Sequence, residues 1–235
     1  MSYASLEYEK ALALGQKEYK ACQAKGLPLY PPVLDEALTG VDTRGEVELG
    51  LVDVPIHLIT GTRSAGRQRA FSPSFYPLLG ADTELAAKWT ALCSAHLSEG
   101  INEPIKVYEY LHDFYVQEGH KRVSVLRYFG AITIPAMVTR ILPPDDGSLT
   151  SRIYQEYLDF YHLTGINYLW FTETGRFARL QSLLGKGPKE PWTREELQDL
   201  FLVYHRFLEV YDAKSARELL ARKVTAGDAL VMLIT

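Results

Sequence analysis

The most chemically informative stretch is Gly119-His120-Lys121-Arg122, at the start of an expected helix over residues 119–129. The first turn of a helix carries unpaired backbone N–H groups and the positive end of the helix dipole, so basic side chains there oppose that field. A bound anion reverses the sign of this interaction, and a glycine lets the backbone approach it closely. These four residues therefore predict a phosphate site.

Two other interpretations of the stretch stay open. In the structural one, Gly119 is a turn residue and Arg122 forms an ion pair with Glu118 or Glu109. In the catalytic one, His120 acts as a general acid or base, because an imidazole titrates close to pH 7. Neither a convincing nucleophile nor a set of metal ligands accompanies His120, so we expect no metal site.

A second basic segment lies in the loop after residues 46–60. Arg63, Arg67 and Arg69 place three guanidinium groups within seven residues, with no acidic residue among them. Guanidinium groups bind phosphate through paired hydrogen bonds, and nearby glycines make the loop pliant. The loop can therefore wrap a phosphate group, although a solvated basic loop without a ligand is the alternative.

Periodicity predicts the elements that carry these residues. The expected strands are at residues 46–60 (one strand or a pair), 105–110, 113–117 and 132–139, and the expected helices are at 82–99 and 119–129. Gly130 closes the second of these helices. This order predicts a small mixed sheet with helices packed on it, an α+β fold.

The segment from His96 to Val138 resembles the core of the ParB and sulfiredoxin superfamily. It contains G-x-x-x-P-I from Gly100, a strand pair, G-x-x-R from Gly119 and G-x-x-x-I-P from Gly130, in that order. The match covers under a fifth of the chain. The resemblance implies a ParB/sulfiredoxin-like fold.

In that family the loop after the first strand lies beside the G-x-x-R helix. The resemblance therefore implies that Arg63, Arg67 and Arg69 face Lys121 and Arg122 across one cleft. It also implies a nucleotide as a ligand or cofactor, or DNA held through its phosphates.

The chain departs from the family pattern at His120 and Lys121. The sulfinic-acid reductase has a cysteine after the motif glycine, so the resemblance does not extend to that activity. Many ParB-like proteins have glutamate there and a further arginine, which puts nucleotide hydrolysis in doubt. We therefore expect a regulatory binding module for a nucleotide or DNA phosphate. A phosphotransfer or nucleotide-hydrolysing enzyme and a structural adaptor without a ligand are the alternatives.

The flanking segments are expected to be helical. We divide the chain into an N-terminal helical arm and linker (1–45), a ParB-like domain (46–142) and an α-helical C-terminal subdomain (143–235). The first helix, over residues 2–25, is either an interaction arm or packs on its own domain, with Leu6, Ala13, Tyr19 and Cys22 toward its buried side. Thr193 and Glu196 predict a capping box.

The chain ends in the apolar run A-L-V-M-L-I-T, which either docks in a groove or marks a fragment that lacks its next domain. The whole chain also resembles the module that precedes a solute-binding domain of the basic-membrane-protein type in some bacterial proteins. That resemblance favours a fragment.

Composition restricts the class of protein. A net charge of -4 and a pI near 5.9 do not suit a general nucleic-acid binder, so recognition of phosphate must be local. Cys22 and Cys93 form neither a disulfide framework nor a zinc motif. Without a signal peptide or a long apolar run, we expect a soluble, cytoplasmic protein that does not bind membranes. A homodimer stays open.

Overall fold

The computed structural model describes residues 2–214 and 224–235. The chain divides into two compact units, Met1–Pro144 and Asp145–Thr235, and each is described by itself. The elements of the first unit are α1 (Tyr3–Lys25), α2 (Leu34–Ala37), β1 (Glu46–Pro55), η1 (Ile56–Leu58), β2 (Ile59–Thr62), η2 (Ala65–Ala70), α3 (Glu84–Glu99), β3 (Ile105–Tyr110), β4 (Asp113–Glu118), α4 (His120–Tyr128) and β5 (Thr133–Ile141).

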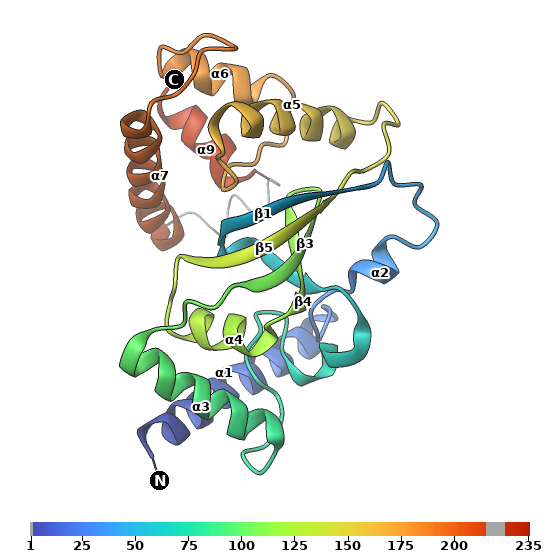
Figure 1. Ribbon diagram of the computed structural model, residues 1–235, viewed down its shortest axis with the longest axis vertical. Coiled ribbons are helices and arrows are strands. Elements are labelled where there is room, and N and C mark those ends of the chain that lie inside the picture. Colours follow the sequence, from blue (N-terminus) through green and yellow to red (C-terminus); the bar gives the residue numbers. More distant parts are fainter. Residues whose placement is uncertain (1, 215–223) are drawn as a thin grey trace. The chain divides into compact units, whose positions relative to one another are not determined.

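The first unit is built on a mixed sheet with the strand order β1-β5-β3-β4-β2 (Figure 1). β1 pairs with β5 and β3 pairs with β4 in antiparallel fashion, whereas β3 with β5 and β2 with β4 are parallel. α1, α3 and α4 lie together on one side of this sheet in Figure 1. The α+β class with a small mixed sheet and packed helices is therefore as the sequence predicts.

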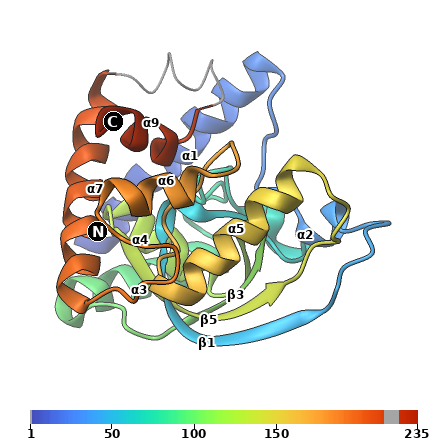
Figure 2. The ribbon, with the colours of Figure 1, turned by 90° about the horizontal axis from the view of Figure 1, so that it is seen from above.

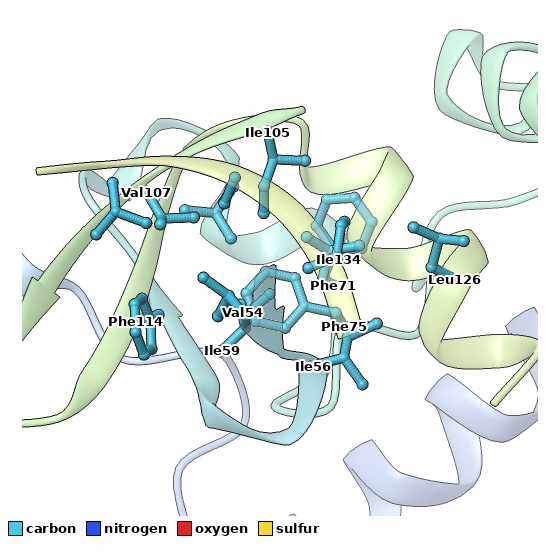
Figure 3. Close-up of a cluster of buried hydrophobic side chains, with 14 residues drawn as sticks. Val54, Ile56, Ile59, Phe71, Phe75, Ile105, Val107, Phe114, Leu126 and Ile134 are labelled. Carbon is cyan, nitrogen blue, oxygen red and sulfur yellow. The ribbon is translucent and has the colours of Figure 1, made fainter. Parts of the chain in front are cut away.

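The core of the first unit joins the sheet, α4 and the loop after η2 (Figure 3). Phe71 and Phe75 from that loop are fully buried, together with Ile105 of β3 and Ile134 of β5. Phe75 adopts a left-handed conformation with φ of 61°. Three hydrogen bonds tie this loop to α1. The Glu18 carboxylate accepts them from the hydroxyls of Ser72 and Ser74 and from the Ser74 N–H. The loop that directly follows the basic residues of η2 is thus fastened to the core and to α1.

Helix α1 packs on its own unit, through a face that the sequence suggested only in part. Its buried residues are Ala4, Glu7, Tyr8, Ala11 and Gly15, whereas Leu6 and Ala13 are exposed and Tyr19 and Cys22 are half-buried. The buried face is made largely of small residues, which allow close approach: a Cβ on Gly15 would lie 2.3 Å from the carbonyl oxygen of Pro77. Tyr19 and Cys22 continue this face at helical spacing, whereas Leu6 and Ala13 lie on the opposite side, so the expectation is right for the first two and wrong for the others.

The second unit is helical. The helices among its described residues are α5 (Leu149–Thr164), α6 (Arg176–Leu183), α7 (Arg194–Lys214) and α9 (Ala226–Leu233). α9 packs against α6 and α7 (Figure 2). The predicted capping box is confirmed, since the Thr193 N–H donates to Glu196 at 2.7 Å and the Glu196 N–H donates to the Thr193 hydroxyl at 3.2 Å.

Candidate functional site

The site begins where the chain turns from β4 into α4. Gly119 occupies the N-cap position with φ of 102°. A Cβ at this position would lie 2.4 Å from Cγ2 of Ile105, so both the backbone conformation and the available space require glycine. Because Gly119 has no side chain, the first turn of α4 lacks the side-chain cap that Ser2 gives α1 and Thr83 gives α3.

A cleft of about 410 Å³ opens at this helix terminus, and we call it the α4 cleft. It is lined by Arg67, Lys88, Ala91, Leu92, Glu103, Glu118, Gly119, His120, Lys121 and Arg122. A second hollow of about 420 Å³ shares Arg67, Lys88 and Lys121 with it. The remaining lining of this second hollow is mainly apolar: Ala70, Phe71, Leu79, Thr83, Glu84 and Leu85. A group held by the shared cations can therefore extend into either hollow.

Lys121 and Arg67 are the two cations of the cleft without an ion-pair partner among the described residues. Burial lowers the pKa of Lys121 from its usual value, and the charges of Arg67 and Lys88 lower it further, although Glu84 acts in the opposite direction. Like charges that lower the pKa of an ammonium group repel it in its charged state. The α4 cleft thus holds excess positive charge beside an uncapped helix N-terminus.

Arg122 lies at the edge of the same cleft. Its Nη1 donates to the carbonyl oxygen of Pro104 at 2.7 Å, and its Nη2 is 2.8 Å from Oε2 of Glu103. Arg122 therefore pairs with neither of the two partners that the sequence suggested, Glu109 and Glu118. Glu109 pairs with Arg140 and Glu118 pairs with Lys106.

Of the three loop arginines, the structure brings only Arg67 to the cleft. Nε of Arg63 is 2.7 Å from Asp35, and its guanidinium carbon lies 4.1 Å from the centre of the Tyr108 ring. Arg69 is exposed and lines neither hollow. The cause is local: residues 65–70 form a 3-10 helix, in which residues two apart point in different directions. The expectation that all three arginines lie across one cleft from Lys121 and Arg122 is therefore wrong for Arg63 and Arg69. Only Arg67 shares the cleft with them.

His120 is turned into the core. It is 6% exposed, its Nε2 lies 2.8 Å from the Thr62 hydroxyl, and its ring stacks on Phe71 with centroids 6.2 Å apart. Burial, followed by the charges of Arg67 and Lys121, lowers the pKa of His120 to about 4. At neutral pH the ring therefore carries no extra proton to donate and adds no charge to the cleft.

Sequence reasoning missed Lys88. Its neighbour Trp89 is fully buried and donates from Nε1 to the Ser124 hydroxyl of α4 at 3.0 Å, which fixes α3 against α4. This packing places Lys88 on the cleft. In the sequence, Glu84 and Lys88 look like an ordinary ion pair four residues apart on a helix, and that pair is present. Only knowledge of how α3 packs on α4 could have added Lys88 to the site.

Within residues 2–214 and 224–235, no cluster of three or more His, Cys, Asp or Glu side chains is placed to bind a metal ion. None of the described helices is both long enough and apolar enough to span a membrane.

Comparisons with known proteins give a likeness among solved structures. No family model matches the chain, and no curated protein matches it. Among solved structures, the chain is similar to the C-terminally truncated chromosome-partitioning protein ParB from Caulobacter crescentus, complexed with CTP-gamma-S. The identity is 15%, the match covers 79% of this chain and 98% of that chain, and the TM-score is 0.28. A likeness at this level defines no correspondence between individual residues, and nothing supports the basic-membrane-protein context.

Proposed function

We propose that the first unit is a regulatory binding module that holds a phosphate-bearing ligand at the N-terminus of α4. Gly119 allows close approach of the backbone, Lys121 and Arg67 supply charge, and Arg122 supplies a guanidinium group at the edge of the α4 cleft. The observation that carries the proposal is the pair Lys121 and Arg67, two neighbouring cations that form no ion pair within the described chain, next to an uncapped helix terminus.

A nucleotide fits this cleft better than DNA does. Ligand pockets typically enclose about 300 to 1,000 Å³, and the two adjoining hollows, of about 410 and 420 Å³, share their cations. Phosphates in the α4 cleft would leave the mainly apolar hollow for a base or sugar. A net charge of -4 also works against a broad DNA-binding surface.

The phosphotransfer and nucleotide-hydrolysis alternatives gain no support from the site. The one candidate acid or base, His120, is buried and neutral at pH 7. The adaptor without a ligand is the outcome expected if no phosphate compound binds.

Ligand titrations of variants that each remove one positive charge test the proposal. Wild type would be titrated with pyrophosphate, a panel of ribonucleoside triphosphates and a short DNA duplex by calorimetry. We expect Arg67→Gln and Lys121→Gln each to weaken binding of the best ligand about tenfold or more, since hydrogen bonds to charged groups contribute about 1.5 to 3 kcal/mol. Arg69→Gln is the control, because it removes the same charge two residues away and should change affinity less than about twofold.

Two results would overturn the proposal. One is that wild type binds none of these phosphate compounds. The other is that Arg69→Gln weakens binding as much as Arg67→Gln, because the effect would then reflect overall charge rather than the α4 cleft.

A further inference from the structure

A second candidate site lies entirely within the helical unit, between α6, α7 and α9. It is a pocket of about 310 Å³, which we call the α9 pocket. Six aliphatic side chains line it: Leu183, Leu184, Leu200, Val203, Leu230 and Ile234. Leu200 and Leu230 are buried, whereas Val203 is 54% exposed. The pocket therefore has an apolar interior and an open mouth, as small-molecule sites commonly do.

The wall that α9 contributes is held in place by polar contacts at its first turn. Asp228 is almost fully buried, and its carboxylate accepts hydrogen bonds from the Thr172 N–H and hydroxyl and from the Thr225 N–H and hydroxyl. Thr225 also forms a capping box with Asp228. A Cβ on Gly227 would lie 2.5 Å from the carbonyl oxygen of Trp170, so α9 sits close against that segment. The pocket is consequently preformed.

The polar groups of the pocket restrict the kind of ligand. Nζ of Lys186 has three acceptors, Glu190 at 3.1 Å, Glu196 at 2.7 Å and the carbonyl oxygen of Pro191 at 3.2 Å. An ammonium group has three N–H donors, so Lys186 has none left for a ligand. The indole ring of Trp192 also lines the pocket, but its Nε1 is buried, so a ligand in the pocket meets the ring rather than the N–H. Neither side chain therefore offers a free donor, which favours a mainly apolar ligand.

Charge further restricts the ligand. The carboxylates of Glu196 and Asp199 line the pocket together with the ammonium of Lys186, and Lys186 is already paired with Glu190 and Glu196. An anion would meet net negative charge and would find no cation available to it. The pocket thus discriminates against acidic amphiphiles.

We propose that the α9 pocket binds a mainly apolar small molecule that carries no negative charge. This site is separate from the α4 cleft and does not depend on the function proposed for it. It also takes a different class of ligand, because it disfavours the negative charge that the α4 cleft favours.

The test uses two fluorescent naphthalene probes that differ in charge. Prodan is neutral, whereas 1-anilinonaphthalene-8-sulfonate is an anion of similar size. With the full chain, we expect saturable binding of one prodan per chain and at least about tenfold weaker binding of the sulfonate.

Two neighbouring positions on α7 provide a matched steric control. Val203 and Leu202 are exposed to a similar degree, 54% and 57%, but only Val203 lines the pocket. Val203→Trp should fill the mouth and abolish prodan binding, whereas Leu202→Trp should leave binding unchanged. Equal effects of the two substitutions, or equal affinity for the two probes, would each overturn the proposal. Circular dichroism would verify that every variant is folded.

Discussion

Arg122 and Glu103 form an ion pair at the edge of the α4 cleft, with Nη2 of the arginine 2.8 Å from Oε2 of the glutamate. The two side chains differ in environment, because Arg122 is 14% exposed and Glu103 is 73% exposed. An exposed carboxylate is a weak, solvent-screened partner. A ligand phosphate can therefore replace Glu103 at this guanidinium group at little cost.

Substitution of Arg122 separates a ligand-binding role from a structural one. Arg122→Ala loses an exposed ion pair and a hydrogen bond to Pro104, but it also removes a cation from the positive end of the α4 dipole. We expect the free energy of unfolding of the free protein to fall by about 1 to 2 kcal/mol. Affinity for a phosphate ligand should fall about tenfold or more.

Chemical denaturation and calorimetric titration would measure these two quantities, with Arg122→Lys as a variant that keeps the charge. A buried, paired arginine would behave differently, since its loss strands a carboxylate and costs about 3 to 5 kcal/mol. A loss of that size, in a protein that binds no phosphate ligand, would make Arg122 purely structural.

Gly119 and Gly130 provide a second test, because they flank α4 and both have positive φ, 102° and 73°. A Cβ at Gly119 would collide with Ile105, whereas nothing lies within 4 Å of a Cβ at Gly130. We expect Gly130→Ala to cost about 1 to 2 kcal/mol, from backbone strain alone. Gly119→Ala should cost about 1 to 3 kcal/mol more, from overpacking. Urea unfolding of both variants would check the order, and equal losses would contradict it.

The sequence was sufficient to predict the elements around α4, because short-range signals specify them. Alternation predicted β3 and β4, and Gly119 and Gly130 bracket the helix that the structure places at His120–Tyr128. The capping box at Thr193 was predictable for the same reason, since both of its residues lie within one turn.

The sequence was not sufficient to predict which residues meet across the cleft. Arg63, Arg67 and Arg69 have the same chemistry, and their sorting depends on the 3-10 helix and on Asp35, which lies far away in the sequence and pairs with Arg63. Lys88 reaches the cleft only because Trp89 packs on α4. Such contacts between distant segments leave no mark in local periodicity.

The buried ring of His120 should make stability depend on pH. Its pKa is about 4 in the folded protein and 6.5 in the unfolded chain, so the unfolded chain binds more protons between these values. Stability contributed by the neutral ring is therefore fully present above pH 6.5 and is lost as pH falls toward 4. The loss should be about 2 to 4 kcal/mol, since one pKa unit corresponds to about 1.4 kcal/mol.

Comparison with His120→Gln isolates this effect from that of Asp113. Burial, with the nearby charge of Glu109, raises the pKa of Asp113 to about 6, so its contribution has the opposite sign and is lost as pH rises through 6. Asp113 is common to both proteins and cancels in their difference. The free energy of unfolding of wild type minus that of His120→Gln should fall between pH 6.5 and 4 and stay constant above pH 7. A constant difference across the whole range would mean that His120 is not held neutral.

The salt dependence of DNA binding provides the last prediction, because it counts the phosphates that the protein neutralises. Four cations line the α4 cleft: Arg67, Lys88, Lys121 and Arg122. Two of them, Lys88 and Arg122, are already paired with glutamates. Since each neutralised phosphate contributes about -0.9 to the slope of log K against log salt concentration, we expect a slope between about -1 and -4 for any binding to duplex DNA. Fluorescence anisotropy of a labelled duplex at several salt concentrations would measure it. A slope near -10, typical of a strong DNA-binding protein, would require a basic surface outside this cleft and would favour DNA over a nucleotide as the ligand.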